Sequence, residues 1–284
     1  MMKTRLAEVI GVILIICGMI LPLNISGQNL KTFEKKYLKE LPHGKPSDAD
    51  APQRYRMTAV YVNRDLYGNF TGKTKVSGDY TRGLENGQVK WNNVKIAGSN
   101  NFDALFSDAV KQEYMENMKY TPSPEMLKED TFVNFPRSSE NVFARNLIWD
   151  MMAIEGFAWD YSDSLKLNRN YIIPQIKGEF EMADIGKYEH NSIHLCWTGI
   201  SLMNGELCAV IEYRAIDNKI EIGMDQIKTK GTEQYWGTTW ISLKSKLIEH
   251  AEMYGGSIQE IEVKGLKDKF LVKTIRELWV DRIQ

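Results

Sequence analysis

The sequence has few of the residues and none of the motifs on which most enzyme and metal sites depend. Its 284 residues include four histidines and three cysteines, and no G-x-S-x-G elbow, phosphate loop or dinucleotide fingerprint occurs. His190 and His194 are four residues apart, but on a strand this spacing separates the two rings by roughly 13 Å, too far for one ion. We therefore predict no metal, no cofactor and no catalytic residue, and a protein that is not an enzyme.

An excess of charge of one sign is also absent. The formal net charge of the chain is −1, and no run of lysine and arginine occurs. Nucleic-acid binding depends on a concentration of positive charge, as does attachment to anionic membrane surfaces. We therefore expect no nucleic-acid partner.

Only one long hydrophobic run occurs, over residues 9–21, with basic residues before it and Pro22 after it. This layout is typical of a secretory signal peptide, and the run is shorter than the roughly 20 residues that span a bilayer. We expect cleavage near Ser26–Gly27 and no stable transmembrane segment afterwards. The protein is then exported, to the periplasm or the cell exterior.

Composition divides the chain into three regions. Residues 1–27 form the predicted signal peptide, residues 28–53 are typical of an exposed N-terminal segment with several prolines, and residues 54–284 are expected to form a single domain. The last region is long enough to bury a substantial core without disulfides. We predict that its two cysteines, Cys196 and Cys208, are free and buried.

The order of predicted elements gives the fold class. Strands begin near Arg54, helical stripes follow over residues 102–118 and 138–161, and strands then continue to the end. Residues 270–283 fit either a helix or a strand, and their β-branched content favours a strand. Because strands and helices do not alternate, we predict an α+β domain: a large, strongly bent, half-barrel-like antiparallel sheet packed on two mid-chain amphipathic helices. The second helix is apolar over more than half of its circumference and should be well buried.

The best-defined local feature is a hairpin at Asn204-Gly205. This dipeptide favours a type I′ turn, so Met203 should face Glu206 and the pairing should continue outward from there. A regular register places Trp197 opposite Glu212, which puts Trp197 and Ile211 on opposite faces, and likewise Cys196 and Cys208. Both faces carry many apolar residues, so we expect both to be covered.

A second aromatic signal lies in the strand "YWGTTWISL", where Trp236 and Trp240 share one face. Such a pair can stack on sugar rings, line an apolar pocket or pack in the core. The sequence leaves these alternatives open.

Four features carry a resemblance: the export signal, the mid-chain helices, the hairpin "SLMNGELCAVIEYRA" and the segment "YWGTTWISLKSKLIEHAEMY". Together they resemble secreted bacterial proteins. In architecture they are similar to periplasmic lipoprotein carriers. That resemblance implies a half-open β-barrel whose concave face, closed by helices, holds acyl chains. It implies no catalytic residue and no individual binding residue.

We therefore predict an exported, non-enzymatic protein that binds an apolar or amphipathic ligand, such as a lipid or a lipoprotein acyl chain, between sheet and helices. The alternatives are an extracytoplasmic hydrolase with a carboxylate pair and a surface module that contacts another protein. The residues predicted to line the ligand site are Trp197, Trp236, Trp240, Ile211, Tyr213, Ile148 and Met152.

Overall fold

The computed structural model describes residues 38, 41, 44–46, 52–123, 129–136, 141–174, 178–183, 185–224 and 226–283. The chain divides into two compact units, Met1–Lys39 and Glu40–Gln284, and the second contains all of the described strands and helices. The predicted signal peptide and its cleavage site lie outside the described residues. Within the described part of the chain, no helix is both long and apolar enough to cross a membrane.

The second unit is built on one antiparallel sheet, and 59% of the described residues are strand. The strands are β1 (Gln53–Asp65), β2 (Phe70–Arg82), β3 (Val89–Ser99), β4 (Val110–Lys111), β5 (Met118–Tyr120), β6 (Asn170–Ile172), β7 (Gly178–Glu181), β8 (Gly186–His190), β9 (Ser192–Met203), β10 (Glu206–Met224), β11 (Ile227–Ser242), β12 (Ile248–Val263) and β13 (Phe270–Ile283). The helical elements are η1 (Glu85–Gly87), η2 (Glu113–Met115), η4 (Glu129–Phe132), α3 (Asn141–Trp159) and η5 (Ser162–Ser164). The C-terminal segment is therefore a strand, as its β-branched residues favoured.

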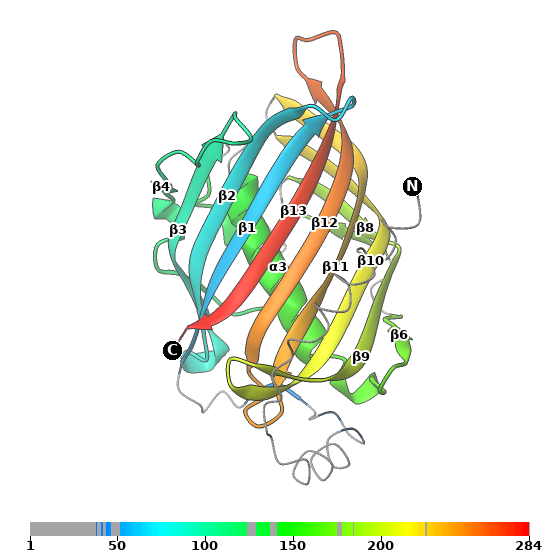
Figure 1. Cartoon of the computed structure of the whole chain (residues 1–284). Coiled ribbons are helices and arrows are strands. Elements are labelled where there is room, and N and C mark those ends of the chain that lie inside the picture. Colours follow the sequence, from blue (N-terminus) through cyan, green and yellow to red (C-terminus); the bar gives the residue numbers. More distant parts are fainter. Residues whose placement is uncertain are drawn as a thin grey trace, which may run out of the picture. The chain divides into compact units, whose positions relative to one another are not determined.

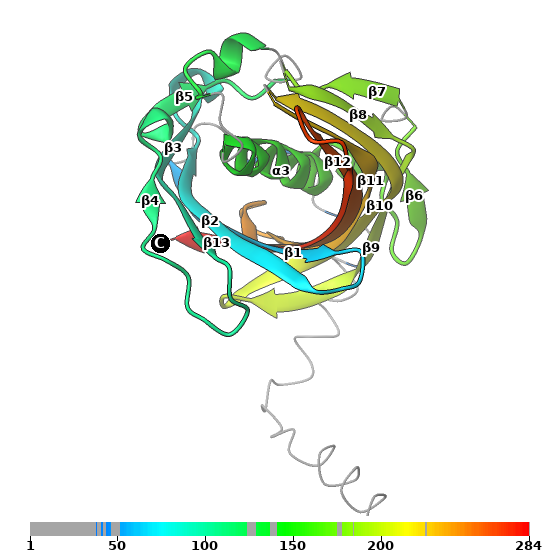
Figure 2. The ribbon, with the colours of Figure 1, turned by 90° about the horizontal axis from the view of Figure 1, so that it is seen from above.

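The sheet curves round α3, which lies inside the curve (Figures 1 and 2). The strand order along its main path is β4-β3-β2-β1-β13-β12-β11-β10-β8-β7. The C-terminal strand β13 therefore pairs with β1, the first strand in the sequence. The long strand β10 pairs with β9 along its first half and with β8 along its second. The sheet as a whole surrounds the single helix α3 on several sides.

The predicted fold class was wrong in its helix content, because α3 is the only α-helix among the described residues and the fold is mostly β. The first predicted helix, over residues 102–118, is instead loop, β4, η2 and part of β5. Local side-chain hydrogen bonds compete with the helix: Asn101 N donates to Ser99 Oγ at 3.2 Å, and Asp103 N donates to Asn101 Oδ1 at 3.0 Å. The expected apolar stripe is not buried either, since Leu105 is 91% exposed.

The second predicted helix is present as α3. The predicted helix began at residue 138, and residues 138–140 lie outside the described residues. The helix is deeply buried, as its broad apolar surface indicated, and Leu147 and Ile148 are fully inaccessible to solvent.

The Asn204-Gly205 turn forms as predicted, with positive φ at both residues and with Met203 paired to Glu206. Further from the turn the predicted register was wrong. A β-bulge at Thr198 shifts the pairing by one residue, so that Trp197 lies opposite Ile211.

The bulge changes which side chains share a face. Trp197 and Ile211 are both buried on the concave side, whereas the convex side of the ribbon exposes Glu212 and Arg214 to solvent. The expectation that both faces are covered was therefore wrong, because the extra residue moves the apolar positions of the two strands onto one face.

The same shift brings Cys196 and Cys208 onto one side of the ribbon, where we had expected them on opposite sides. They pair with Glu212 and Ser201 respectively, four positions apart along the ribbon, which separates them by roughly 13 Å. Both thiols are free, as predicted, but Cys208 is buried and Cys196 is only partly buried.

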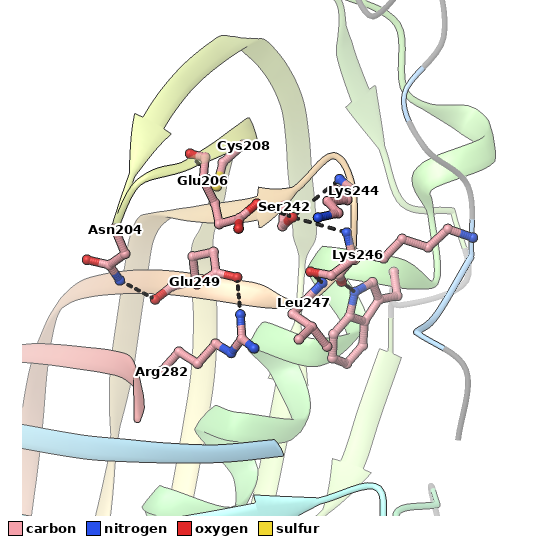
Figure 3. A network of polar contacts seen from close by, with 11 residues as sticks. Asn204, Glu206, Cys208, Ser242, Lys244, Lys246, Leu247, Glu249 and Arg282 are labelled. Atoms are coloured by element: carbon pink, nitrogen blue, oxygen red, sulfur yellow. Dashed lines mark hydrogen bonds and ion pairs between the residues drawn. The ribbon is translucent and has the colours of Figure 1, made fainter. Parts of the chain in front are cut away.

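Polar contacts fix one end of the curved sheet (Figure 3). Asn204 Nδ2 donates to the Glu249 carbonyl at 3.1 Å, and Arg282 Nη1 lies 2.6 Å from Glu249 Oε1. At the same end, Trp159 Nε1 donates to the Lys246 carbonyl at 2.9 Å. These bonds tie the β9–β10 turn to β12 and hold the C-terminal end of α3 against the β11–β12 turn.

A candidate ligand-binding cavity between the helix and the sheet

A cavity of about 600 Å³ lies between one face of α3 and the concave side of the sheet. Its sheet wall includes parts of β1, β7, β8 and β10 to β13. On α3 the lining residues recur at helical spacing, so that they form one continuous stripe. The stripe includes Val142, Asn146, Trp149, Ala153 and Gly156, and Asp160 continues it just after the end of the helix.

Part of the cavity wall is mainly apolar. Ile220, Ile222 and Met224 on β10 line it and pack near Val142 and Trp149 of α3. The alternation of strand side chains places these β10 residues on the concave face, while the residues between them point to solvent. The wall there offers an aliphatic ligand a surface like that of a protein core.

The cavity wall also carries a buried ionic cluster. Arg276 Nη1 donates to both carboxylate oxygens of Asp150, at 2.9 and 3.1 Å, and its Nη2 lies 3.2 Å from Met253 Sδ. Glu233 Oε1 is 3.9 Å from Nη2. Burial raises the pKa of Asp150 to about 6, against the opposing attraction of Arg276 and with a further increase from Glu233.

Aromatic rings form a connected group beside this cluster. The ring of His190 lies 4.8 Å from that of Tyr188, 5.4 Å from that of Phe180 and 6.4 Å from that of Tyr235. Phe157 of α3 continues the group, 6.5 Å from Tyr235. Burial lowers the pKa of His190 to about 4, so its ring is neutral at pH 7 and adds no positive charge.

Of the seven residues predicted to line a ligand site, Met152 lines this cavity. Ile148, Ile211 and Tyr213 are buried on the concave side, and Tyr213 donates from its hydroxyl to the Glu252 carbonyl at 2.8 Å. Trp197 is buried outside the cavity lining.

The other two tryptophans lie on the convex face. Trp236 is 48% exposed and stacks on Tyr254 with ring centres 6.4 Å apart, while Trp240 lies 5.2 Å from the ring of His250. They share a face, as the strand alternation indicated, but that face points away from α3. A binding role for the seven residues stays a prediction.

Sequence reasoning did not find the polar lining residues. Asp150, Glu233 and Arg276 are far apart along the chain, and each is an ordinary charged residue in its local pattern. One local signal was present. Residues two apart on a strand share a face, and Glu233 and Arg276 each lie two residues before a buried apolar residue, Tyr235 and Leu278 respectively.

The described residues contain no group of three or more histidine, cysteine, aspartate or glutamate side chains placed to hold a metal ion. Asp150 and Glu233 both lie in the cavity lining, and the guanidinium of Arg276 contacts both, at 2.9 and 3.9 Å. It occupies the position that a water or substrate takes between the two acids of a glycosidase. The arrangement therefore does not favour the hydrolase alternative.

No model of a known protein family matches the chain, and no curated protein matches it. Among solved structures, the chain is similar to lipovitellin, in a structure of its lipid–protein interactions, with a TM-score of 0.44, 10% identity and coverage of 82% of this chain. It spans 25% of the lipovitellin chain. A DUF1329 family protein from Desulfovibrio piger is similar with a TM-score of 0.15 and 10% identity, over 82% of this chain and 87% of that one. Both TM-scores are too low for a functional inference.

Proposed function

We propose that this protein is an exported, non-enzymatic binding protein that holds an apolar or amphipathic molecule, such as a lipid, in the cavity between α3 and the sheet. The observation that supports this most directly is the cavity itself, about 600 Å³ and lined largely by apolar and aromatic side chains. Its volume falls within the range of about 300–1,000 Å³ that is usual for sites that bind small molecules.

The physical argument is that protein interiors are normally filled. Cores pack as densely as organic crystals, and apolar surface that faces a space forgoes the contacts that stabilise it. Here one face of the helix borders the cavity instead of packing against the sheet. A ligand with a hydrocarbon part would restore those contacts and remove apolar surface from water, at about 25 cal/mol per Å².

The first test measures binding of a neutral fluorescent probe. The protein is delipidated and titrated with N-phenyl-1-naphthylamine, whose emission rises when it leaves water. We expect saturable binding, and we expect Ala153→Trp to weaken it at least tenfold, because an indole at this position fills the space beside Gly156 and Trp149.

The matched control changes an aromatic residue outside the cavity. Trp236→Ala removes a half-exposed ring from the convex face and should leave probe binding unchanged. A protein that takes up no probe, or an Ala153→Trp variant that binds it as well as the parent chain does, contradicts the proposal. Loss of binding in Trp236→Ala alone would move the site to the convex surface.

A further inference from the structure

The charged residues that line the cavity are mostly acidic. Among the described lining residues, four are carboxylic acids and one is a permanent cation. The acids are Asp150, Asp160, Glu181 and Glu233, and the cation is Arg276. Asp160 has a partner outside the lining, Lys45, at 3.0 Å. Within the described lining, the positive charge of Arg276 can balance only one of the other three acids. The polar part of the cavity therefore carries an excess of negative charge.

Arg276 is not free to bind an anionic ligand. Its Nη1 is held by both oxygens of Asp150, its Nη2 lies against Met253 Sδ, and the side chain is only 10% exposed. An incoming carboxylate or phosphate would have to displace Asp150 and leave that acid buried without its cation. Breaking a buried, hydrogen-bonded ion pair in this way is strongly unfavourable.

Glu233 is left with an incompletely neutralised carboxylate. Its distance to Arg276, 3.9 Å, is longer than a hydrogen bond, and Asp150 holds the same guanidinium more closely. The negative charge of Glu233 also acts on its neighbours. It adds to the effect of burial in raising the pKa values of Tyr188 and Tyr235 above their ordinary range.

Aromatic residues lie near this carboxylate. Tyr235 lies two residues from Glu233 on the same face of β11, and the rings of Tyr188, His190 and Phe157 extend the group across β8 and α3. The electron-rich faces of aromatic rings attract cations and are used to recognise quaternary ammonium groups, and a nearby carboxylate adds a direct electrostatic attraction.

We infer that the cavity selects an amphiphile whose polar group is positively charged, an amine or a quaternary ammonium, with Glu233 and the rings of Tyr188 and Tyr235 around that group. The inference rests on the proposed function, because it assigns the headgroup of the molecule whose hydrocarbon part fills the cavity. It excludes free fatty acids and anionic lipids as preferred ligands.

The test compares three ligands that share a dodecyl chain: dodecyltrimethylammonium, dodecanoate and a neutral dodecyl ether of a short ethylene glycol. Each displaces N-phenyl-1-naphthylamine from the delipidated protein at pH 7, below its micelle concentration. We expect the ammonium compound to bind at least tenfold more tightly than the carboxylate, with the neutral ether between them.

Two variants locate the effect. Glu233→Gln keeps the shape of the side chain and removes its charge, so the ratio of ammonium affinity to neutral-ether affinity should fall about tenfold. Tyr188→Leu keeps an apolar wall and removes the ring, so the same ratio should fall about fivefold. The control is Glu277→Gln, which removes an equal charge from the exposed face of β13 and should leave the ratio unchanged.

The outcomes separate this inference from the proposed function. If dodecanoate binds as tightly as the ammonium compound, or if Glu233→Gln leaves the ratio unchanged, the headgroup inference is wrong and the cavity still binds amphiphiles. If neither the probe nor any of the three ligands binds, the proposed function fails, and the headgroup inference fails with it.

Discussion

Two faces of the same helix differ in what they contact. One face of α3 is fully buried, and its residues pack against protein on every side: Ala144, Leu147, Ile148, Met151 and Ile154. The other face is partly buried and lines the cavity, through Val142, Asn146, Trp149, Met152, Ala153 and Gly156. Both faces are mainly apolar, so composition does not distinguish a helix face that forms core from one that forms a binding wall.

The difference lies in whether neighbouring side chains reach the helix. On the cavity side β12 contributes Gly255 and Gly256, which have no side chains to fill the space. On the packed side, large residues of other elements are fully buried as well, among them Tyr55, Met57 and Trp91. A helix that is apolar round more than half of its circumference therefore has more apolar surface than its own core uses, and the surplus is available to a ligand.

The largest expected effect concerns Asp150 and Arg276, at the boundary between the two faces. Arg276→Met should lower the free energy of unfolding by about 3–5 kcal/mol, because it leaves the buried carboxylate of Asp150 without its cation. Urea denaturation measures the change. Lys273→Met, on the exposed face of the same strand, should change stability by less than about 0.5 kcal/mol. Equal effects of the two substitutions would show that the ion pair is not buried.

Truncation of apolar side chains should distinguish the faces directly. Ile148→Ala on the packed face should cost about 2–5 kcal/mol of unfolding free energy, because it leaves a void among residues that cannot collapse fully. Met152→Ala on the cavity face should cost about 1 kcal/mol or less in the ligand-free protein, since part of that side chain already faces space. A cost for Met152→Ala as large as that for Ile148→Ala would contradict the comparison.

The pH dependence of stability should report the burial of Asp150. Its pKa in the folded protein, about 6, lies above the ordinary value of 3.8, so the folded state holds the proton more tightly than the unfolded chain does. The resulting stabilisation is fully present below the ordinary value of 3.8 and is lost as the pH rises through about 6, a change of about 2–3 kcal/mol.

The comparison with Asp150→Asn isolates this residue, because asparagine cannot ionise. The difference in unfolding free energy between the parent chain and the variant should fall between about pH 4 and about pH 7. A difference that is constant over this range would mean that Asp150 titrates alike in the folded and unfolded states.

Added volume should have the smallest effect, and it should again differ between the faces. Ala144→Leu on the packed face should cost about 1–3 kcal/mol, because the core has no room for the extra carbons. Ala153→Leu on the cavity face should leave stability unchanged to within about 1 kcal/mol or raise it slightly, because the new side chain enters the cavity. Thermal unfolding of the two variants side by side tests this, and an equal loss in both would mean that the space beside Ala153 is too small for a ligand.

Local signals predicted the features that depend on neighbouring residues. The turn at Asn204-Gly205 requires positive φ, which these two residues adopt readily, and the 3.6-residue periodicity of α3 is set by its own sequence. The bulge at Thr198 was not predictable, because a single extra residue leaves the apolar alternation of each strand intact and changes only the register between them.

The first predicted helix shows why periodicity alone was insufficient. Residues 102–118 have an apolar stripe, but the side chains of Ser99 and Asn101 bond to nearby backbone amides, and Ser107 Oγ accepts from Gly98 N at 3.1 Å. These bonds satisfy the backbone without a helix, and pairing of the segment with β3 satisfies more of it. In a helix and in the observed loop alike, the backbone amides and carbonyls of this segment can form hydrogen bonds. The sequence pattern does not show which of the two conformations also fits the edge of the sheet.

The sequence by itself determined the antiparallel strands, the hairpin turn, the free thiols and the broad apolar surface of α3, because each depends on the residue types within a short stretch of chain. Only the tertiary structure decided that one helix lies inside the curved sheet, that part of its surface faces a cavity, and that Asp150, Glu233 and Arg276 meet there. The physical reason is that a cavity is a property of distances between elements. Those distances depend on the curvature of the sheet. They depend equally on where side chains are present and on where they are absent.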